Sequence, residues 1–112
     1  MKITKHSELE IMDTPHKVDA RVMYNNENAQ AVVITLQPGE SLKPHITPVD
    51  VFFYILEGNP SVRVGEETIL VEKDSLIESP KDIVHCLSNN SDSIAKILVV
   101  KAPKPKTQAK LL

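Results

Sequence analysis

The chain has 112 residues, of which 41% are hydrophobic and 25% charged, and its formal net charge is −2. This length fits one domain with its own core, and the charge balance does not favour general binding to nucleic acids. The single cysteine, Cys86, excludes a disulfide within the chain and favours a reducing compartment. Neither a membrane-spanning apolar run nor a signal peptide is evident, so we expect a cytoplasmic protein that binds no membrane and no nucleic acid.

Alternation of apolar and polar residues, rather than a helical period, dominates the chain from residue 18 onward. In chain order, strands are expected at residues 18–24, 31–36, 51–56, 61–64, 68–71, 76–77, 83–87 and 94–101. Turn residues separate these strands at intervals of about eight to twelve residues, which is typical of an antiparallel sandwich or barrel. The one helix that the pattern allows lies at residues 6–12, with Ser7 as its cap. The first strand is expected to place Val18, Ala20, Val22 and Tyr24 on one face.

Two of the expected strands, at residues 31–36 and 51–56, are apolar on both faces. A small barrel buries only the inner face of its strands, so the second face needs another cover. The N-terminal arm or a second subunit can supply that cover. We therefore predict a homodimer that packs through the outer face of a sheet.

A single histidine between two turns marks the middle of the chain, in the segment Pro38–Gly58. This segment resembles the first motif of the cupin family, which has a glycine, two histidines, a glutamate and a closing glycine at fixed spacing. His45 stands at the first histidine position. Thr47 replaces the second histidine, and Val51 replaces the glutamate.

A later segment resembles the second cupin motif, in which two glycines, a proline, a histidine and an asparagine recur at fixed spacing. Pro80, His85 and Asn89 stand at the matching positions, whereas Asp74 and Asp82 replace the two glycines. Both motifs keep their spacing although several residue types have changed.

The resemblance covers residues 30–101 and implies an all-β fold. The expected fold is a cupin-type jelly-roll barrel, or double-stranded β-helix, of two antiparallel sheets with a ligand in its open mouth. Residues 1–29 would form an N-terminal arm and the first strand or strands. Residues 102–112 would form a basic, proline-containing tail exposed to solvent.

The resemblance also implies where a metal ion would bind. Residues two apart on a strand point to the same face, so the two histidines of the first motif can share an ion with the histidine of the second. Here the candidate ligands of a divalent Fe, Mn, Ni or Zn ion are His45 and His85, with Asp50 as a possible carboxylate. Thr47 and Val51 are poor or impossible ligands, and we expect them to line the pocket with Phe53.

Two residues are candidates for catalysis, His85 and Glu78. Glu78 precedes Ser79 and Pro80 at the end of a strand. If its side chain points inward, the carboxylate lies in an apolar pocket and suits acid–base chemistry. If it points outward, Glu78 is only a surface charge.

The favoured interpretation is a cupin that binds a small organic molecule, with weak or absent metal binding. One alternative is a metal-dependent enzyme, like a dioxygenase or isomerase, that uses His45 and His85. Another alternative is a metal-free acid–base isomerase or epimerase. The sequence identifies no ligand and does not decide whether the protein is an enzyme, because this fold hosts many activities.

Overall fold

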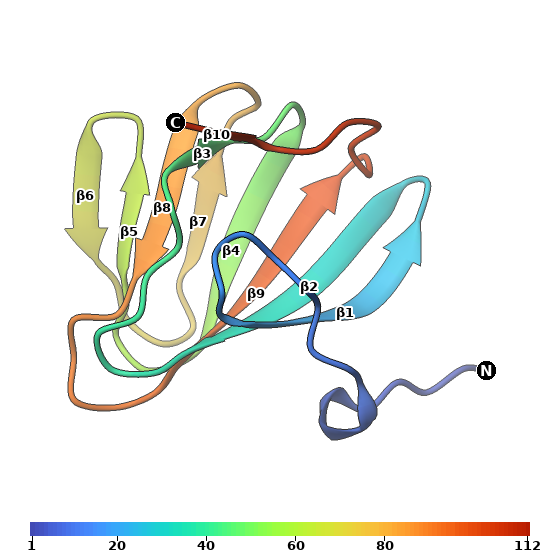
Figure 1. Cartoon of the computed structure of the whole chain (residues 1–112), viewed down its shortest axis with the longest axis horizontal. Coiled ribbons are helices and arrows are strands. Elements are labelled where there is room, and N and C mark those ends of the chain that lie inside the picture. Colours follow the sequence, from blue (N-terminus) through green and yellow to red (C-terminus); the bar gives the residue numbers. More distant parts are fainter.

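Two facing antiparallel sheets make up the computed structural model, which describes all residues from 1 to 112 (Figure 1). One sheet has the order β1 (Asp19–Asn26), β2 (Ala29–Leu36), β9 (Ala95–Ala102), β4 (Asp50–Glu57), β7 (Leu76–Ser79). The other has the order β10 (Lys110–Leu111), β3 (His45–Ile46), β8 (Val84–Ser88), β5 (Ser61–Val64), β6 (Glu67–Leu70). This arrangement confirms the expected all-β jelly roll, and every strand expected from the alternation is present.

The core lies between the two sheets, where alternate residues of the strands meet. The largest fully buried apolar side chains are those of Leu36, Phe53, Ile55, Leu87 and Ile97. Each side chain of this kind stabilises the fold by about 1.5–3 kcal/mol when it leaves water. The core therefore holds the sheets together at one end of the barrel and leaves the other end free for a site.

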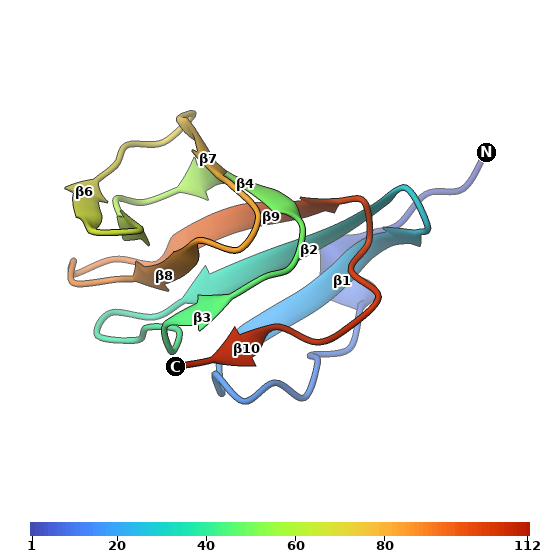
Figure 2. The ribbon, with the colours of Figure 1, turned by 90° about the horizontal axis from the view of Figure 1, so that it is seen from above.

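The C-terminal segment contacts the barrel, although most of residues 102–112 are exposed to solvent. After β9 the chain crosses one end of the barrel and returns to the opposite sheet as β10 (Figure 2). Lys110 and Leu111 pair with Ile46 and His45 of β3, and residues 105–109 line a cavity. Strands of two residues show no measurable alternation, which is why β3 and β10 were not expected from the sequence.

The expected helix at residues 6–12 is reduced to a single 3-10 turn, η1 (His6–Glu8). Ser7 lies inside this turn and provides no cap. Nη1 of Arg21 donates a hydrogen bond of 3.1 Å to the carbonyl of His6, which ties the arm to the outer face of β1. No helix in the structure has the length and hydrophobicity needed to cross a membrane.

The outer face of β2 is covered within one chain. Val33 and Thr35 point away from the core, yet each is only 7% exposed. Val33 pairs with Arg21, the residue that binds the N-terminal arm, so the arm lies over this part of the sheet. The outer face of the strands farther from β1 is less covered, and Leu76 of β7 is 53% exposed there.

A β-bulge corrects the expected direction of Tyr24. The register of β1 against β2 shifts between Val22 and Tyr24, so one extra residue turns the end of the strand. Tyr24 is 55% exposed instead of facing inward with Val18 and Ala20.

The positions at which the cupin motifs have glycine adopt a left-handed backbone conformation in this chain. Asp74 and Asp82 have φ angles of 66° and 64°, which aspartate tolerates better than most residues. Gly58 has a φ of 83°, and a Cβ atom there would lie 2.4 Å from the carbonyl oxygen of Ile94. The first motif therefore needs its closing glycine for both conformation and space.

Candidate functional site

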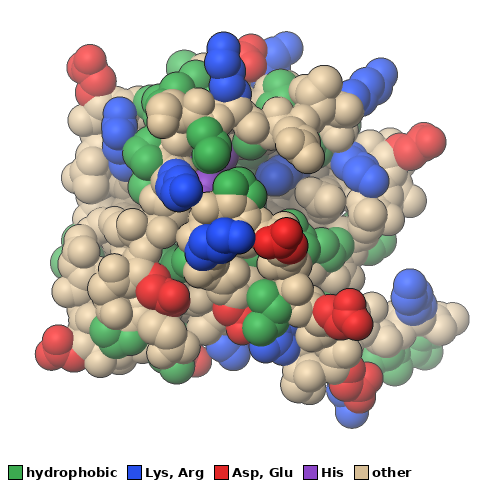
Figure 3. Space-filling view, viewed as in Figure 1, with side chains coloured by type: hydrophobic (Ala, Val, Ile, Leu, Met, Phe, Trp, Pro, Cys, Tyr) green, Lys and Arg blue, Asp and Glu red, His purple; other side chains and the backbone are tan.

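A cavity of about 510 Å³ opens at one end of the barrel, between the two sheets. Its apolar wall includes Val18, Ala20, Val32, Ile34, Leu42, Val51, Phe53 and Val99. Its polar side chains include Thr14, His16, Gln30, His45, His85, Lys101 and Gln108. In the space-filling view a histidine is visible at the bottom of an opening framed by hydrophobic and basic side chains (Figure 3).

Strand pairing brings the two motif histidines together. His45 of β3 and His85 of β8 are direct partners across the antiparallel pair. Their Nε2 atoms lie 3.0 Å apart, and the rings meet edge to face with centroids 4.5 Å apart. His45 is 7% exposed and His85 is 2% exposed, so the pair is buried at the base of the cavity.

The hydrogen-bond partners of the two rings define their tautomers. The carbonyl of Lys43 can only accept, so Nδ1 of His45 donates to it at 2.8 Å and leaves a lone pair on Nε2. Nε2–H of His85 then donates to that lone pair, and Nδ1 of His85 accepts from the Ser79 hydroxyl at 2.7 Å. A continuous chain of hydrogen bonds therefore runs from Ser79 through both imidazoles to a backbone carbonyl.

A third imidazole, His16, joins the cavity from the N-terminal segment. The backbone N–H of Lys43 donates to its Nδ1 at 2.8 Å, so the proton of the neutral ring is on Nε2. Its ring centroid lies 4.8 Å from that of His45. No motif spacing includes His16, so sequence reasoning had no basis for placing it beside the other two histidines.

All three imidazoles are neutral at pH 7. Burial lowers the pKa of His85 to about 3, and the neighbouring His45 and Lys101 add to the effect. Burial, followed by the proximity of His45 and Lys43, lowers the pKa of His16 to about 4. Burial also lowers the pKa of His45, although its hydrogen bond to Lys43 acts in the opposite direction. The cavity therefore carries neutral hydrogen-bonding rings rather than a cluster of positive charges.

The structure places Val51 and Phe53 on the cavity wall and Thr47 just behind it. Thr47 is 2% exposed, and its hydroxyl lies 3.1 Å from Nε2 of His85, where it shares the ring proton with His45. The residue at the position of the second motif histidine therefore orients His85 by a hydrogen bond instead of extending into the cavity.

The two candidate carboxylates point away from the histidines. Asp50 accepts a hydrogen bond of 2.9 Å from the backbone N–H of Lys81 and lies on the outer surface. Glu78 is exposed in the same outer depression, because the next residue, Ser79, takes the inward direction of β7. Neither Asp50 nor Glu78 reaches the imidazoles, so Ser79 rather than Glu78 is the polar partner of His85 in this strand.

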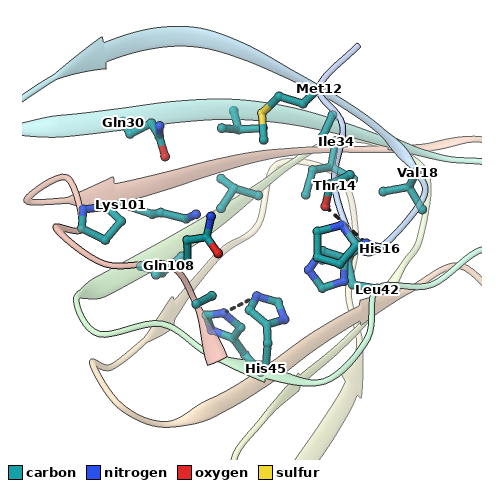
Figure 4. A pocket seen from close by; sticks show the side chains of 18 of the residues that line it. Met12, Thr14, His16, Val18, Gln30, Ile34, Leu42, His45, Lys101 and Gln108 are labelled. Atoms are coloured by element: carbon teal, nitrogen blue, oxygen red, sulfur yellow. Dashed lines mark hydrogen bonds between the residues drawn. The ribbon is translucent and has the colours of Figure 1, made fainter. Parts of the chain in front are cut away.

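Lys101 is another cavity residue that the sequence did not single out. It ends the inward-facing series Ile97, Val99, Lys101 of the central strand β9, and its amine extends into the cavity from the side opposite His16 (Figure 4). Lys101 makes no ion pair, and burial lowers its pKa. Asp13 is the only acidic residue on the lining, and its exposed side chain pairs with Lys17 at the rim.

These donors fit a metal ion poorly. The separation of 3.0 Å between the Nε2 atoms matches two ligands at right angles on an ion with bonds of about 2.0–2.1 Å. However, no group of three or more histidine, cysteine, aspartate or glutamate side chains is placed to hold a metal. Lys101 lines the same cavity, and its ammonium form would repel a cation. The site therefore offers two imidazole ligands, His45 and His85, and the nearby amine of Lys101 opposes binding of a cation.

The chain belongs to the cupin family. The family model of the cupin domain matches residues 32–101, which include both motifs and the paired histidines. The chain is also 31% identical, over 71 residues, to the tetracenomycin polyketide synthase protein TcmJ of Streptomyces glaucescens. That match covers 62% of this chain and 48% of TcmJ, so the chain spans about half the length of this relative.

Solved structures share the fold of this chain. TT1209 from Thermus thermophilus has a TM-score of 0.80 at 33% identity, over 94% of this chain and 100% of that chain. The polyketide cyclase RemF from Streptomyces resistomycificus has a TM-score of 0.84 at 18% identity, over 100% of this chain and 85% of that chain. The likeness to RemF shows the fold alone.

Proposed function

We propose that this cupin binds a small organic molecule in its barrel, with weak or no affinity for metal ions. The ligand presents carbonyl, enolate or carboxylate oxygens beside an apolar body. The observation that carries this proposal is the amine of Lys101, which extends into a cavity that has no buried carboxylate to neutralise it. The volume of about 510 Å³ falls within the range of small-molecule sites.

The polar groups of the cavity are suited to accepting oxygen atoms. Lys101, Gln30 and Gln108 carry N–H donors, and His16 keeps a proton on Nε2 that no protein group accepts. The opposite wall consists of aliphatic side chains and Phe53. A ligand with oxygen atoms at one end and a ring or chain at the other satisfies both sides.

The relative TcmJ supports this choice of ligand chemistry. TcmJ, which is 31% identical to this chain over 71 residues, is described as a polyketide synthase protein. Polyketides combine ketone or enol oxygens with a carbon skeleton, which is the pattern that the cavity favours.

The hydrogen-bond chain through the two imidazoles favours a second candidate function, acid–base catalysis without a metal. When the His85 proton lies on Nδ1 and is donated to the Ser79 hydroxyl, Nε2 of His45 is free to take a proton from a ligand. The charged ring then donates to the Lys43 carbonyl through a strengthened hydrogen bond. An isomerase or cyclase would use such a pair.

The binding proposal is tested by NMR titration with 2-naphthoate, which combines a carboxylate with an aromatic body. We expect shifts at the backbone amides of Val51, Val99 and Lys101, and binding at least about tenfold weaker in a Lys101→Met protein. Lys106→Met, which removes an exposed amine near the rim, is the matched control. Shifts confined to the outer surface, or equal binding by both variants, would overturn the proposal.

The metal-dependent alternative is tested on untagged protein purified without chelators. We expect elemental analysis to find far less than one Fe, Mn, Ni or Zn atom per chain. A near-stoichiometric metal that is lost in a His45→Ala protein would favour the metal-dependent alternative instead.

A further inference from the structure

We propose that Lys101 is a nucleophile, whose amine forms an imine with a ketone or aldehyde bound in the cavity. This inference rests on the proposed function, since the carbonyl compound must first enter the same site. It adds a covalent step and a narrower ligand class, carbonyl compounds with a hydrogen on the neighbouring carbon.

Lys101 is held in the cavity by the central strand of a sheet, unlike a lysine on the surface. The residue belongs to β9, the middle strand of its sheet, and pairs with Gln30 on one side and Val51 on the other. Both neighbours line the cavity with it. Strand pairing on both sides fixes the backbone position of Lys101. Its amine therefore lies close to the cavity groups that can bind oxygen atoms.

Because the first motif has valine in place of its glutamate, the amine of Lys101 has no carboxylate partner. Val51 stands where the family motif has a glutamate, and it is the direct cross-strand partner of Lys101. A carboxylate at residue 51 would form an ion pair with Lys101 and favour the ammonium form, which is not nucleophilic. With valine there, Lys101 has no carboxylate partner, and burial lowers its pKa toward the range in which amines attack carbonyl groups.

The reaction balances without an oxidant or reductant. The nitrogen lone pair of Lys101 adds to the carbonyl carbon, and the carbonyl π electrons move to oxygen. Transfer of both nitrogen protons to that oxygen allows water to leave, which yields the neutral imine. A proton then moves from the neighbouring carbon to the imine nitrogen, and the product is an enamine.

Neutral imidazoles of the same cavity can carry the protons of these steps. The Nε2–H of neutral His16 can donate a hydrogen bond to the carbonyl oxygen, and His45 can accept a proton when His85 has its own proton on Nδ1 and donates it to the Ser79 hydroxyl. The chain therefore contains the nucleophile, a donor for the carbonyl oxygen and a proton acceptor.

Benzoylacetone is a suitable probe, because a 1,3-diketone and an amine condense to a stable, conjugated enaminone with loss of one water molecule. The protein is incubated with benzoylacetone near pH 7.5, and adduct formation is followed by intact mass and by near-ultraviolet absorbance. Peptide mapping then locates the adduct, and equilibrium dialysis at short times measures non-covalent binding.

We expect one adduct per chain, with the mass of benzoylacetone minus water, located on Lys101. Its rate should exceed that of the exposed Lys73 by at least about tenfold, because burial lowers the pKa of Lys101 and the cavity holds the carbonyl compound beside its amine. Lys101→Arg should abolish the fast adduct, and Lys73→Arg should retain it. The mapping in wild-type protein decides the question even if a variant folds poorly.

Two results would overturn the inference in distinguishable ways. Binding without an adduct, or adducts spread evenly over exposed lysines, would reject the nucleophile and leave the proposed binding function intact. Absence of both binding and adduct, together with failure of 2-naphthoate to bind, would reject the binding function as well.

Discussion

Lys101 of β9 lies directly across from Val51 of β4, and both side chains face the cavity. This pairing links the altered motif to the chemistry of the site. The position at which the family motif has a carboxylate ligand here holds valine, and the adjacent strand contributes an amine. The cavity therefore has a lysine amine beside the position at which the family motif has a carboxylate ligand.

Restoring the carboxylate should restore metal binding. In Val51→Glu combined with Lys101→Met, the new carboxylate points toward His45 and His85, and the competing amine is removed. Two imidazoles and one carboxylate form a known zinc shell, so calorimetric titration of chelator-treated protein should show about one Zn²⁺ site per chain.

The control for this prediction is Val51→Gln with Lys101→Met, which has a side chain of similar size without the charge. Wild-type protein and this control should bind Zn²⁺ at least about a hundredfold more weakly. Tight binding by wild-type protein would show that two imidazoles and other groups already complete a metal shell.

Acid should destabilise the fold through the buried imidazoles. An unfolded histidine titrates near its model value of 6.5, whereas in the folded chain His85 titrates at about 3 and His16 at about 4. The unfolded state therefore binds more protons as the pH falls below 6.5, and stability decreases between about pH 6.5 and pH 3. Above pH 7 this contribution to stability is fully present.

Urea unfolding at several pH values measures this effect. The free energy of unfolding should depend less steeply on pH in His85→Gln than in wild-type protein. Between pH 4 and pH 6 the difference in slope should correspond to up to about one proton taken up on unfolding. Parallel slopes for the two proteins would mean that His85 is not held neutral in the folded state.

Gly58 should be far less replaceable than Gly39. Both have positive φ angles, 83° and 87°, but only at Gly58 would a Cβ atom meet the backbone of Ile94 and Ala95. Gly39→Ala should cost about 1–2 kcal/mol for the left-handed backbone alone. Gly58→Ala should cost about 1–3 kcal/mol more for the clash, as measured by chemical denaturation. Equal losses would argue against the close contact at Gly58.

Much of this architecture follows from local patterns, while the site depends on long-range contacts. Alternation predicted the long strands, and the spacing of the two motifs predicted that His45 and His85 would lie together. Asp50 and Glu78 were ambiguous, because one residue of register decides which face of a strand a side chain takes. His16 and residues 105–109 come from segments without alternation, and only their tertiary contacts bring them to the cavity.

The C-terminal segment should contribute to ligand affinity more than to stability. Residues 105–109 form part of the cavity wall, whereas β10 adds only Lys110 and Leu111 to its sheet. Removal of residues 103–112 should weaken 2-naphthoate binding by about tenfold and change the melting temperature little. Removal of the exposed Leu112 alone is the control and should leave affinity unchanged. Unchanged affinity in the longer truncation would mean that the segment does not contact the ligand.

The predicted homodimer can be tested on the outer face of the β4–β7 sheet. Leu76 is 53% exposed there and lines the same outer depression as Phe52, whereas Ile69 is 55% exposed on the other sheet. Sedimentation analysis should show a dimer that Leu76→Lys dissociates and Ile69→Lys preserves. A wild-type monomer at high concentration, or dissociation only by Ile69→Lys, would contradict this assignment of the interface.

The most direct test of the account is the affinity of the protein for 2-naphthoate with and without a chelator. Because Lys101 rather than a metal ion is proposed to bind the ligand oxygens, the dissociation constant should be the same in excess chelator and should rise at least about tenfold in Lys101→Met. Binding that disappears with chelator, returns with added metal and does not depend on Lys101 would contradict it.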